Sequence, residues 1–482
     1  MKFSSDVIEK NKWLFIIVVI AAIINVTYSV VVQRGVYLDG ATLFLSALNK
    51  YASSSFEFAV NDYQPRFFLQ SIIQLPMAIS YSYFGVKSKH ILSLLFSLSL
   101  FLYPLLLLLW NYKLTQKTKR YDIFVFSILV YLLFLLPFSI FSAAENSIAF
   151  LLMFVLLNFI VGEYEYSSND YILMLFLSVI MFGSYEGIVV IGPFLMLFSL
   201  YYAHKSDSDL TKKIKHLVAG TIFSAVIFNI VFFLSNQAAL EEVKLNASKL
   251  FSWTQNFFEL NTLLLLPFFV LLPFLVVRKK ELSVFIKLAI FFVCSILFVF
   301  MMRNLSVFIV PPLEEQLRAL PMIFVPLIFL LLFVLTLFNK KIPQIVCTNL
   351  LSLALICGIF QIAWQINNSY WFNKNINFMR NKLLECNTEL CYLDDIEISS
   401  YNNSSLRRFI WNYNYVPYSI IFSKNRNIDR ILMPPFSGKG LGESMRENIK
   451  IKDEMLDVCF YLVSVKNDFW DLTEAVKKLD HK

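Results

Sequence analysis

The chain has 482 residues, of which 58% are hydrophobic and only 16% charged, and its mean hydropathy is +0.64. A soluble domain carries roughly a quarter charged residues and under half apolar ones. The composition therefore excludes a soluble globular enzyme, a disordered chain and a disulfide-rich secreted domain, and it predicts a multi-span membrane protein. The net charge of +8 then concerns how Lys and Arg are distributed across the bilayer, not nucleic-acid binding.

Apolar runs are long and frequent enough to predict an all-α polytopic protein. A helix needs ~20 apolar residues to cross about 30 Å of hydrocarbon, and fewer when it packs inside a bundle. Eleven spans are expected, at Trp13–Val32, His90–Tyr112, Ile123–Phe141, Asn146–Val161, Ile172–Tyr185, Ile188–Ala203, Leu217–Ser235, Thr262–Val277, Ser283–Met302, Ile323–Phe338 and Ile345–Ile366.

The segment Phe67–Gly85 decides the topology. If it crosses the membrane, every later loop changes side. If it lies in the interface, sixteen Lys and Arg residues fall on inner loops and nine on outer loops before residue 323. The positive-inside rule favours the second arrangement. A polar stripe of Arg66, Gln70 and Gln74, with Pro76 beyond it, also predicts a juxtamembrane helix on the outer face.

The apolar segment Ile172–Ala203 is 32 residues long, so one helix would extend about 48 Å. That length is too great for one ordinary span. We therefore expect a hairpin of two short helices that turns at Gly183–Gly187. With this hairpin, the basic segment Lys205–Lys215 lies inside.

Two domains are predicted. Residues 1–366 form the transmembrane domain, with a first outer loop at 33–89, and residues 367–482 form a small α/β extracytoplasmic domain. The amino terminus is expected in the cytoplasm and the carboxyl terminus outside. Cys386 and Cys391 lie in the second domain, where they can form a bridge or remain two thiols.

Ionisable groups near the hydrocarbon are candidates for function. Asp39, in Tyr37-Leu38-Asp39-Gly40, is either a general base at the outer surface or a helix cap. Arg66 either binds a lipid phosphate through two parallel hydrogen bonds or anchors the interface by snorkelling.

Three acidic residues and one further arginine complete the set of candidates. Glu145 opens a span and can serve as a helix cap, whereas Glu186 lies between two apolar stretches at the tip of the hairpin. Arg318, in an outer loop just before Ile323, either neutralises a phosphate or pairs with Glu314 four residues earlier.

Other motifs point to no metal or nucleotide site. The four histidines have no ligand spacing, so no histidine metal site is expected. Gly438-Lys-Gly-Leu-Gly442 departs from the P-loop pattern and is expected to be a loop. No span has the paired breaks typical of secondary transporters.

Together these segments resemble the GT-C class of integral membrane glycosyltransferases. The matching residues are Tyr37-Leu38-Asp39-Gly40, Gln64-Pro-Arg-Phe-Phe68 and Tyr83-Phe-Gly85, then the span His90–Tyr112 with the basic loop Lys113–Arg120. Glu145 matches a second outer acidic residue. Asp39 is followed by Gly, whereas many members have an acidic pair, so a divalent metal remains open. The size and the outer carboxyl-terminal domain look like the bacterial enzymes that add a glucosyl branch to O-antigen.

The resemblance implies an inverting transfer of a sugar, such as glucose, from a polyprenyl phosphate to a cell-surface polysaccharide on the outer face of the inner membrane. Asp39 would act as base, and Arg66 or Arg318 would stabilise the leaving phosphate. Glu145, Glu186 and Glu314 would support the site. An O-antigen polymerase or ligase and a lipid-linked sugar flippase or transporter remain as alternatives. The sugar, the acceptor, the linkage and the oligomeric state are not predicted.

Overall fold

A computed structural model describes residues 10–36, 39–53, 58–59, 66–136, 145–236, 310–338, 342–385, 390–392, 415–423, 431–433 and 468–469. The backbone alone is described for Asp39 and Ser53 and for residues 310–320, 323, 390–392, 415–416 and 431–433. The spans predicted at Thr262–Val277 and Ser283–Met302 lie outside this part of the chain, as do Cys386 and residues 438–442.

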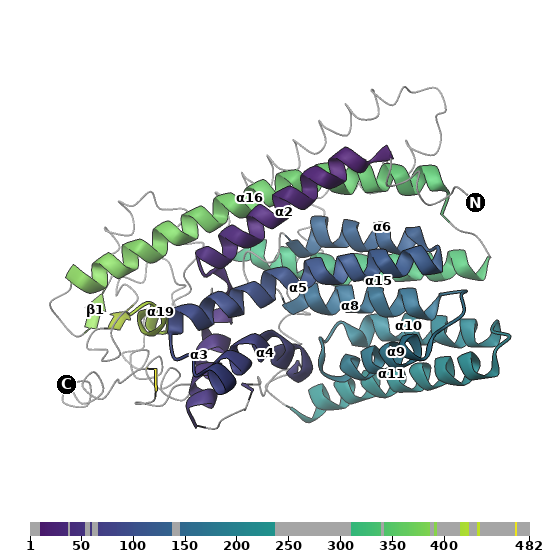
Figure 1. Ribbon diagram of the computed structural model, residues 1–482, viewed down its shortest axis with the longest axis horizontal. Coiled ribbons are helices and arrows are strands. Elements are labelled where there is room, and N and C mark those ends of the chain that lie inside the picture. The colour runs from purple at the N-terminus through teal and green to yellow at the C-terminus, as the bar shows by residue number, and fades with distance from the viewer. Residues whose placement is uncertain are drawn as a thin grey trace.

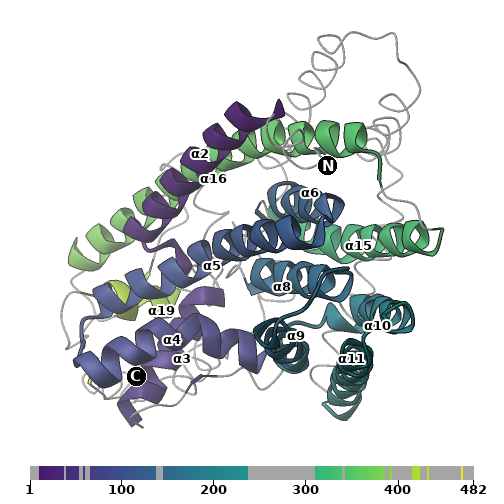
Figure 2. The same cartoon turned by 45° about the vertical axis from the view of Figure 1, so that its right-hand side comes forward.

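The described chain is predominantly helical. Its helices are α2 (Lys12–Val31), η1 (Arg34–Val36), α3 (Asp39–Ser53), α4 (Phe67–Phe84), α5 (Lys89–Thr118), α6 (Tyr121–Val130), η2 (Tyr131–Leu135), α8 (Glu145–Ile160), α9 (Ser168–Ile180), η3 (Met181–Gly183), α10 (Ile188–His204), α11 (Asp209–Ser235), α15 (Val310–Leu337), α16 (Gln344–Glu385) and α19 (Tyr415–Phe422). Helices α5, α6, α8 and α15 run side by side, and α2 and α16 lie together along one side of that group (Figures 1 and 2).

In the described part of the chain, four helices are long and apolar enough to cross a membrane, by length and composition. They are α2, α5, α11 and α16. Shorter apolar helices are found at α6, α8, α9, α10 and the second half of α15. The protein thus has the helices of a membrane protein, and nine of the eleven predicted spans coincide with a described helix.

Local sequence explains where several helices begin and end. The side chains of Ser88 and Ser208 accept hydrogen bonds from the backbone N–H groups of Ile91 and Thr211, and so cap α5 and α11. Ser167 and Asp170 form a reciprocal capping box at α9. At the other terminus of a helix, Gly85 ends α4 with φ of +63°, a left-handed conformation that glycine adopts at little cost.

Polar contacts between helices define two ends of the bundle. At one, which we call the Arg120 end, Arg120 before α6 meets Tyr202 near the end of α10, and Tyr201 meets Thr336 near the end of α15. The starts of α9 and α11 join there through Tyr171 and Thr211. At the opposite Arg66 end, Arg66 meets the first residue of α8 and the turn before α10. The basic residues of loops 113–120 and 205–215 therefore gather at one end.

Helix α4 begins and ends at the Arg66 end. Its amino-terminal neighbour Arg66 contacts Glu145 and Glu186. Five residues after its last residue the chain enters α5, where His90 contacts Gln33, two residues after α2 ends. Both termini of α4 thus lie at one end of the bundle, as expected for an interfacial helix and not for a span.

The predicted hairpin at Ile172–Ala203 is confirmed. Helix α9 ends at Ile180, a short 3-10 turn covers Met181–Gly183, and α10 begins at Ile188. The turn falls where the sequence predicted it.

Two helices are longer than predicted. The segment before Ile323 was expected to be a loop, but α15 already begins at Val310. Pro311 and Pro312 fall in its first turn, where the missing N–H has no partner to lose. Helix α16 continues through the predicted domain boundary at Ile366 to Glu385, because Phe372, Ile376 and Met379 keep an apolar face buried at helical spacing.

The described part of the carboxyl-terminal region packs on the Arg66 end. Strands β1 (Leu390–Tyr392) and β2 (Ile431–Met433) pair in parallel, and α19 packs against α3 and α16. The Lys89 ammonium donates to the Ile420 carbonyl of α19 at 2.7 Å, and Lys87 pairs with Asp468 at 2.6 Å.

A candidate active site around Arg66

Arg66 is held by two carboxylates from distant parts of the chain. Its Nε and Nη2 donate to Oε2 and Oε1 of Glu186 at 2.9 and 2.6 Å, and its Nη1 donates to Oε2 of Glu145 at 3.0 Å. The contact with Glu186 is the bidentate fork that planar guanidinium and carboxylate groups favour. We call these three side chains the Arg66 cluster.

Each member stands at the start of a helix. Arg66 precedes α4, Glu145 is the first residue of α8, and Glu186 lies in the turn just before α10. A helix amino terminus carries partial positive charge, which stabilises a nearby carboxylate. The cluster thus joins three helix starts at one end of the bundle.

Aromatic rings and a glycine shape the surroundings. The guanidinium of Arg66 lies 4.6 Å from the centroid of the Tyr185 ring, and that ring packs edge-on against Phe150 at 5.5 Å. A Cβ added to Gly183 would lie 2.7 Å from the ring of Phe67. A side chain at position 183 would therefore displace the Phe67 ring, so glycine lets the turn pack closely on α4.

The three side chains of the cluster are mostly buried, but Arg66 and Glu186 keep some exposure to solvent. The side chains of Arg66 and Glu186 are 18% and 19% exposed, and that of Glu145 is 8% exposed. Burial disfavours the charged form of Arg66, but the carboxylates of Glu186 and Glu145 outweigh burial, so its pKa is raised above the ordinary value. The guanidinium therefore remains charged at any physiological pH.

This geometry leaves hydrogen-bond donors of Arg66 available for a ligand. A guanidinium has five N–H donors, and the bonds of Arg66 to the two glutamates use three of them. Two donors remain for phosphate or hydroxyl oxygens. Within the described ranges no group of three or more His, Cys, Asp or Glu side chains could hold a metal ion.

The structure brings together three of the six residues predicted as a site. Arg66, Glu145 and Glu186 converge, although they are 79 and 120 residues apart in sequence. Asp39 is the first residue of α3, and its side chain lies outside the described part of the structure. Glu314 and Arg318 lie in the first turns of α15, and their side chains are likewise not described.

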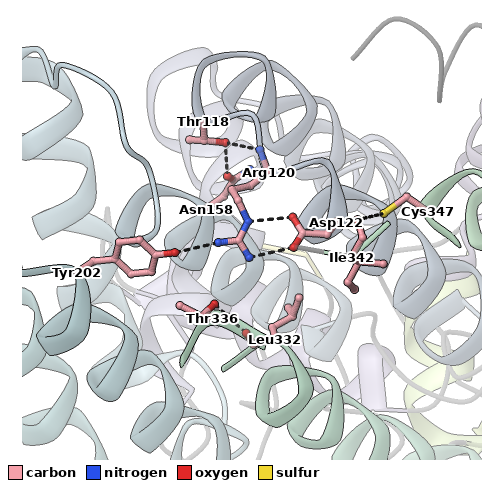
Figure 3. A network of polar contacts seen from close by, with 9 residues as sticks. All are labelled: Thr118, Arg120, Asp122, Asn158, Tyr202, Leu332, Thr336, Ile342 and Cys347. Carbon is pink, nitrogen blue, oxygen red and sulfur yellow. Dashed lines mark hydrogen bonds and ion pairs between the residues drawn. The ribbon is translucent and has the colours of Figure 1, made fainter. Parts of the chain in front are cut away.

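A second polar cluster, at the Arg120 end, was not singled out from the sequence (Figure 3). Nε and Nη2 of Arg120 donate to the two carboxylate oxygens of Asp122 at 3.0 and 2.9 Å, and Nη1 donates to the Tyr202 hydroxyl at 3.1 Å. The Thr118 hydroxyl donates to Asn158 at 2.7 Å. These contacts join the end of α5 to α6, α8 and α10.

Arg120 and Asp122 are only 6% exposed, so solvent has little access to this second cluster. Its contacts tie helices α5, α6, α8 and α10 to one another. We take the Arg120 cluster as structural. Its residues were missed because, in sequence, Arg120 is one of several basic residues in a loop.

No family model, no curated protein and no solved structure matches the chain.

Proposed function

We propose that this protein is a GT-C-like membrane glycosyltransferase that takes a sugar from a polyprenyl-phosphate donor at the outer face of a bacterial inner membrane. The single observation that carries the proposal is the Arg66 cluster, two carboxylates and a guanidinium at the end of the bundle opposite the basic loops. Charged groups there lie where a lipid-linked substrate presents its phosphate and a polysaccharide presents its hydroxyls.

The order of elements agrees with this role. Helix α3 begins with Asp39, α4 follows with Arg66 just before its start, and α5 then leads to the basic loop. Asp39 would take the proton from the attacking hydroxyl of the acceptor. The two spare N–H donors of Arg66, together with Arg318, would bind the leaving phosphate. Glu145 and Glu186 would hold the guanidinium in a fixed plane, with Glu314 as a further acidic group beside Arg318.

The placement of Glu186 weighs against transport. A transporter needs polar groups near the bilayer midplane, between paths to both sides. Glu186 instead lies in a turn at one end of the bundle, in contact with Arg66. Glucose as the sugar, O-antigen as the acceptor and the extracytoplasmic carboxyl-terminal domain complete the proposal.

The test is transfer of radiolabelled glucose from polyprenyl phosphate to lipopolysaccharide in membrane vesicles. We expect Asp39→Asn to lower the rate at least 100-fold with unchanged protein level, because removing a general base costs about 10²–10⁴ in rate. Asp209→Asn is the matched control, since Asp209 is exposed at the opposite end and its partner among the described residues is the exposed Lys213.

Full activity of Asp39→Asn would remove the base assignment. Absence of transfer by the native protein with every polyprenyl-phosphate sugar tried would remove the proposed function itself.

A further inference from the structure

The short link between α2 and α3 is a buried turn. Arg34 and Val36 are 3% and 0% exposed and Gly35 is buried as well, although they follow a helix with many exposed apolar side chains. Gln33, just before them, has φ of +57°, which is uncommon for a residue with a side chain. A buried turn that adopts such a backbone is held by its surroundings.

On one side, the turn lies directly on the backbone of α5. The N–H of Gly35 donates to the Ser97 hydroxyl at 2.9 Å. A Cβ added at Gly35 would lie 2.6 Å from the Ser97 Cα and 3.0 Å from its nitrogen. Backbone atoms in a helix cannot rotate away from such a contact, so only glycine fits at position 35.

Gly40 then lies on Gly35. A Cβ added at Gly40 would lie 1.9 Å from the carbonyl oxygen of Gly35 and 3.1 Å from its carbonyl carbon. The first turn of α3, which contains Asp39, is thereby in backbone contact with the turn, and the turn is in backbone contact with α5. No second acidic side chain can follow Asp39, because position 40 has no room for a Cβ.

On the other side, Arg34 fastens the same turn to α16. Its Nη1 donates to the Ser369 hydroxyl at 2.8 Å and to the Gln365 carbonyl at 3.1 Å. The turn is thus fixed between α5 and α16, two of the four described helices that are long and apolar enough to cross a membrane.

We infer that Gly35, Gly40 and Ser97 are positioning residues that fix the backbone of Asp39 relative to α5, so that its carboxylate meets the acceptor hydroxyl at the outer face. The role rests on the proposed function, in which Asp39 is the base. The three residues act through Asp39 and touch no substrate. A displacement of about 1 Å in a reacting group can lower a rate about 100-fold.

The first experiment measures transfer by Gly40→Ala and Ser97→Ala. Gly220→Ala and Ser99→Ala are the matched controls, because a Cβ at Gly220 meets no atom within 4 Å and the Ser99 hydroxyl bonds only within α5. We expect Gly40→Ala to lower kcat at least tenfold and Ser97→Ala three- to tenfold, with KM for the donor within twofold. Both controls should stay within twofold of the native rate.

A second readout does not depend on activity. Asp39→Cys is placed in a background whose six cysteines are replaced by serine, and its rate of reaction with a soluble thiol reagent is measured. We expect Ser97→Ala and Gly40→Ala to change this rate at least threefold, and Ser99→Ala and Gly220→Ala to leave it unchanged. Ser97→Ala adds no atom, so it keeps the test usable if Gly40→Ala does not fold.

The outcomes are separable. Unchanged labelling of Cys at position 39 in both test variants would overturn the positioning role, whatever the activity. Altered labelling together with no sugar transfer by the native protein would remove the proposed function. The turn would then have only the structural role of fixing the start of α3. Altered labelling with a native rate in Ser97→Ala and Gly40→Ala would also overturn the role in transfer.

Discussion

Arg66 pairs with both Glu145 and Glu186, so removing it leaves two partly buried carboxylates without their shared cation. Removing one partner of a buried ion pair costs about 3–5 kcal/mol, whereas replacing the whole set by uncharged groups is often near neutral. The exposure of 18% at Arg66 reduces the first figure. We therefore predict that Arg66→Met destabilises the protein more than Arg66→Met combined with Glu145→Gln and Glu186→Gln.

The measurement is the free energy of unfolding in detergent for each of the two variants. If the combined variant is as unstable as the single one, Arg66 does not stabilise the two carboxylates. The three side chains are then not energetically coupled, despite their short distances.

Asp122 provides a second test at the scale of a residue. It is 6% exposed and accepts two hydrogen bonds from Arg120, so Asp122→Asn leaves a buried guanidinium with one charged partner fewer. We expect a loss of about 3–5 kcal/mol in the free energy of unfolding. Asp209→Asn, at an exposed pair in α11, should give no measurable change. Equal stability of the two variants would show that Arg120 does not need its partner.

Sequence alone identified Arg66, Glu145 and Glu186, because isolated charges stand out in a chain that is 16% charged. Their convergence was not predicted, since contacts across 79 and 120 residues depend on how helices pack. Arg34 and Arg120 were counted only as loop charges. Their burial follows from tertiary contacts with α16 and α10, and no local pattern marks it.

At the scale of the element, the length of an apolar segment predicted the helices more reliably than its composition did. The hairpin of α9 and α10 follows from a segment too long for one span, and α4 ends at the glycine where the apolar segment was expected to stop. Composition gave a wrong helix end at Ile366, where the sequence turns polar although the helix continues. Helix α16 extends about 63 Å at 1.5 Å per residue, about twice the hydrocarbon thickness, while its sequence turns polar.

The pairing of α2 with α16 gives a prediction about elements. Ser352 donates to Asn11 at 2.6 Å, and Ser29 meets Ser369 at 3.4 Å, so the two helices run parallel. We expect the cysteine pairs Asn11→Cys with Ser352→Cys, and Ser29→Cys with Ser369→Cys, to be cross-linked by a short bis-maleimide, which alkylates both thiols. The crossed pair Asn11→Cys with Ser369→Cys should not react, because Ser352 and Ser369 are about 25 Å apart along the helix. Reaction of the crossed pair alone would mean an antiparallel arrangement.

For the whole molecule, the contacts and the charge pattern support each other. Helices α5, α8, α10 and α15 end at the Arg120 end, whereas α6, α9, α11 and α16 begin there, so the chain alternates in direction as a polytopic protein must. The alternation holds only if α4 returns to the end from which it started. The sequence reached the same arrangement from charge counts on loops, a physically independent argument.

The orientation of this alternating bundle in a membrane follows from its basic end. Single cysteines at exposed positions can report it, with Lys119→Cys and Asp207→Cys at the Arg120 end and Tyr83→Cys and Ser235→Cys at the opposite end. Because loops rich in Lys and Arg stay in the cytoplasm, an impermeant thiol reagent should label the second pair in right-side-out vesicles and the first pair in inverted vesicles. Labelling of Tyr83→Cys together with Lys119→Cys would mean that α5, which lies between these two positions, does not cross the membrane. Exchange of the two pairs as a whole would place the Arg66 cluster in the cytoplasm, where nucleotide sugars are available, and would remove the reason for a lipid-linked donor.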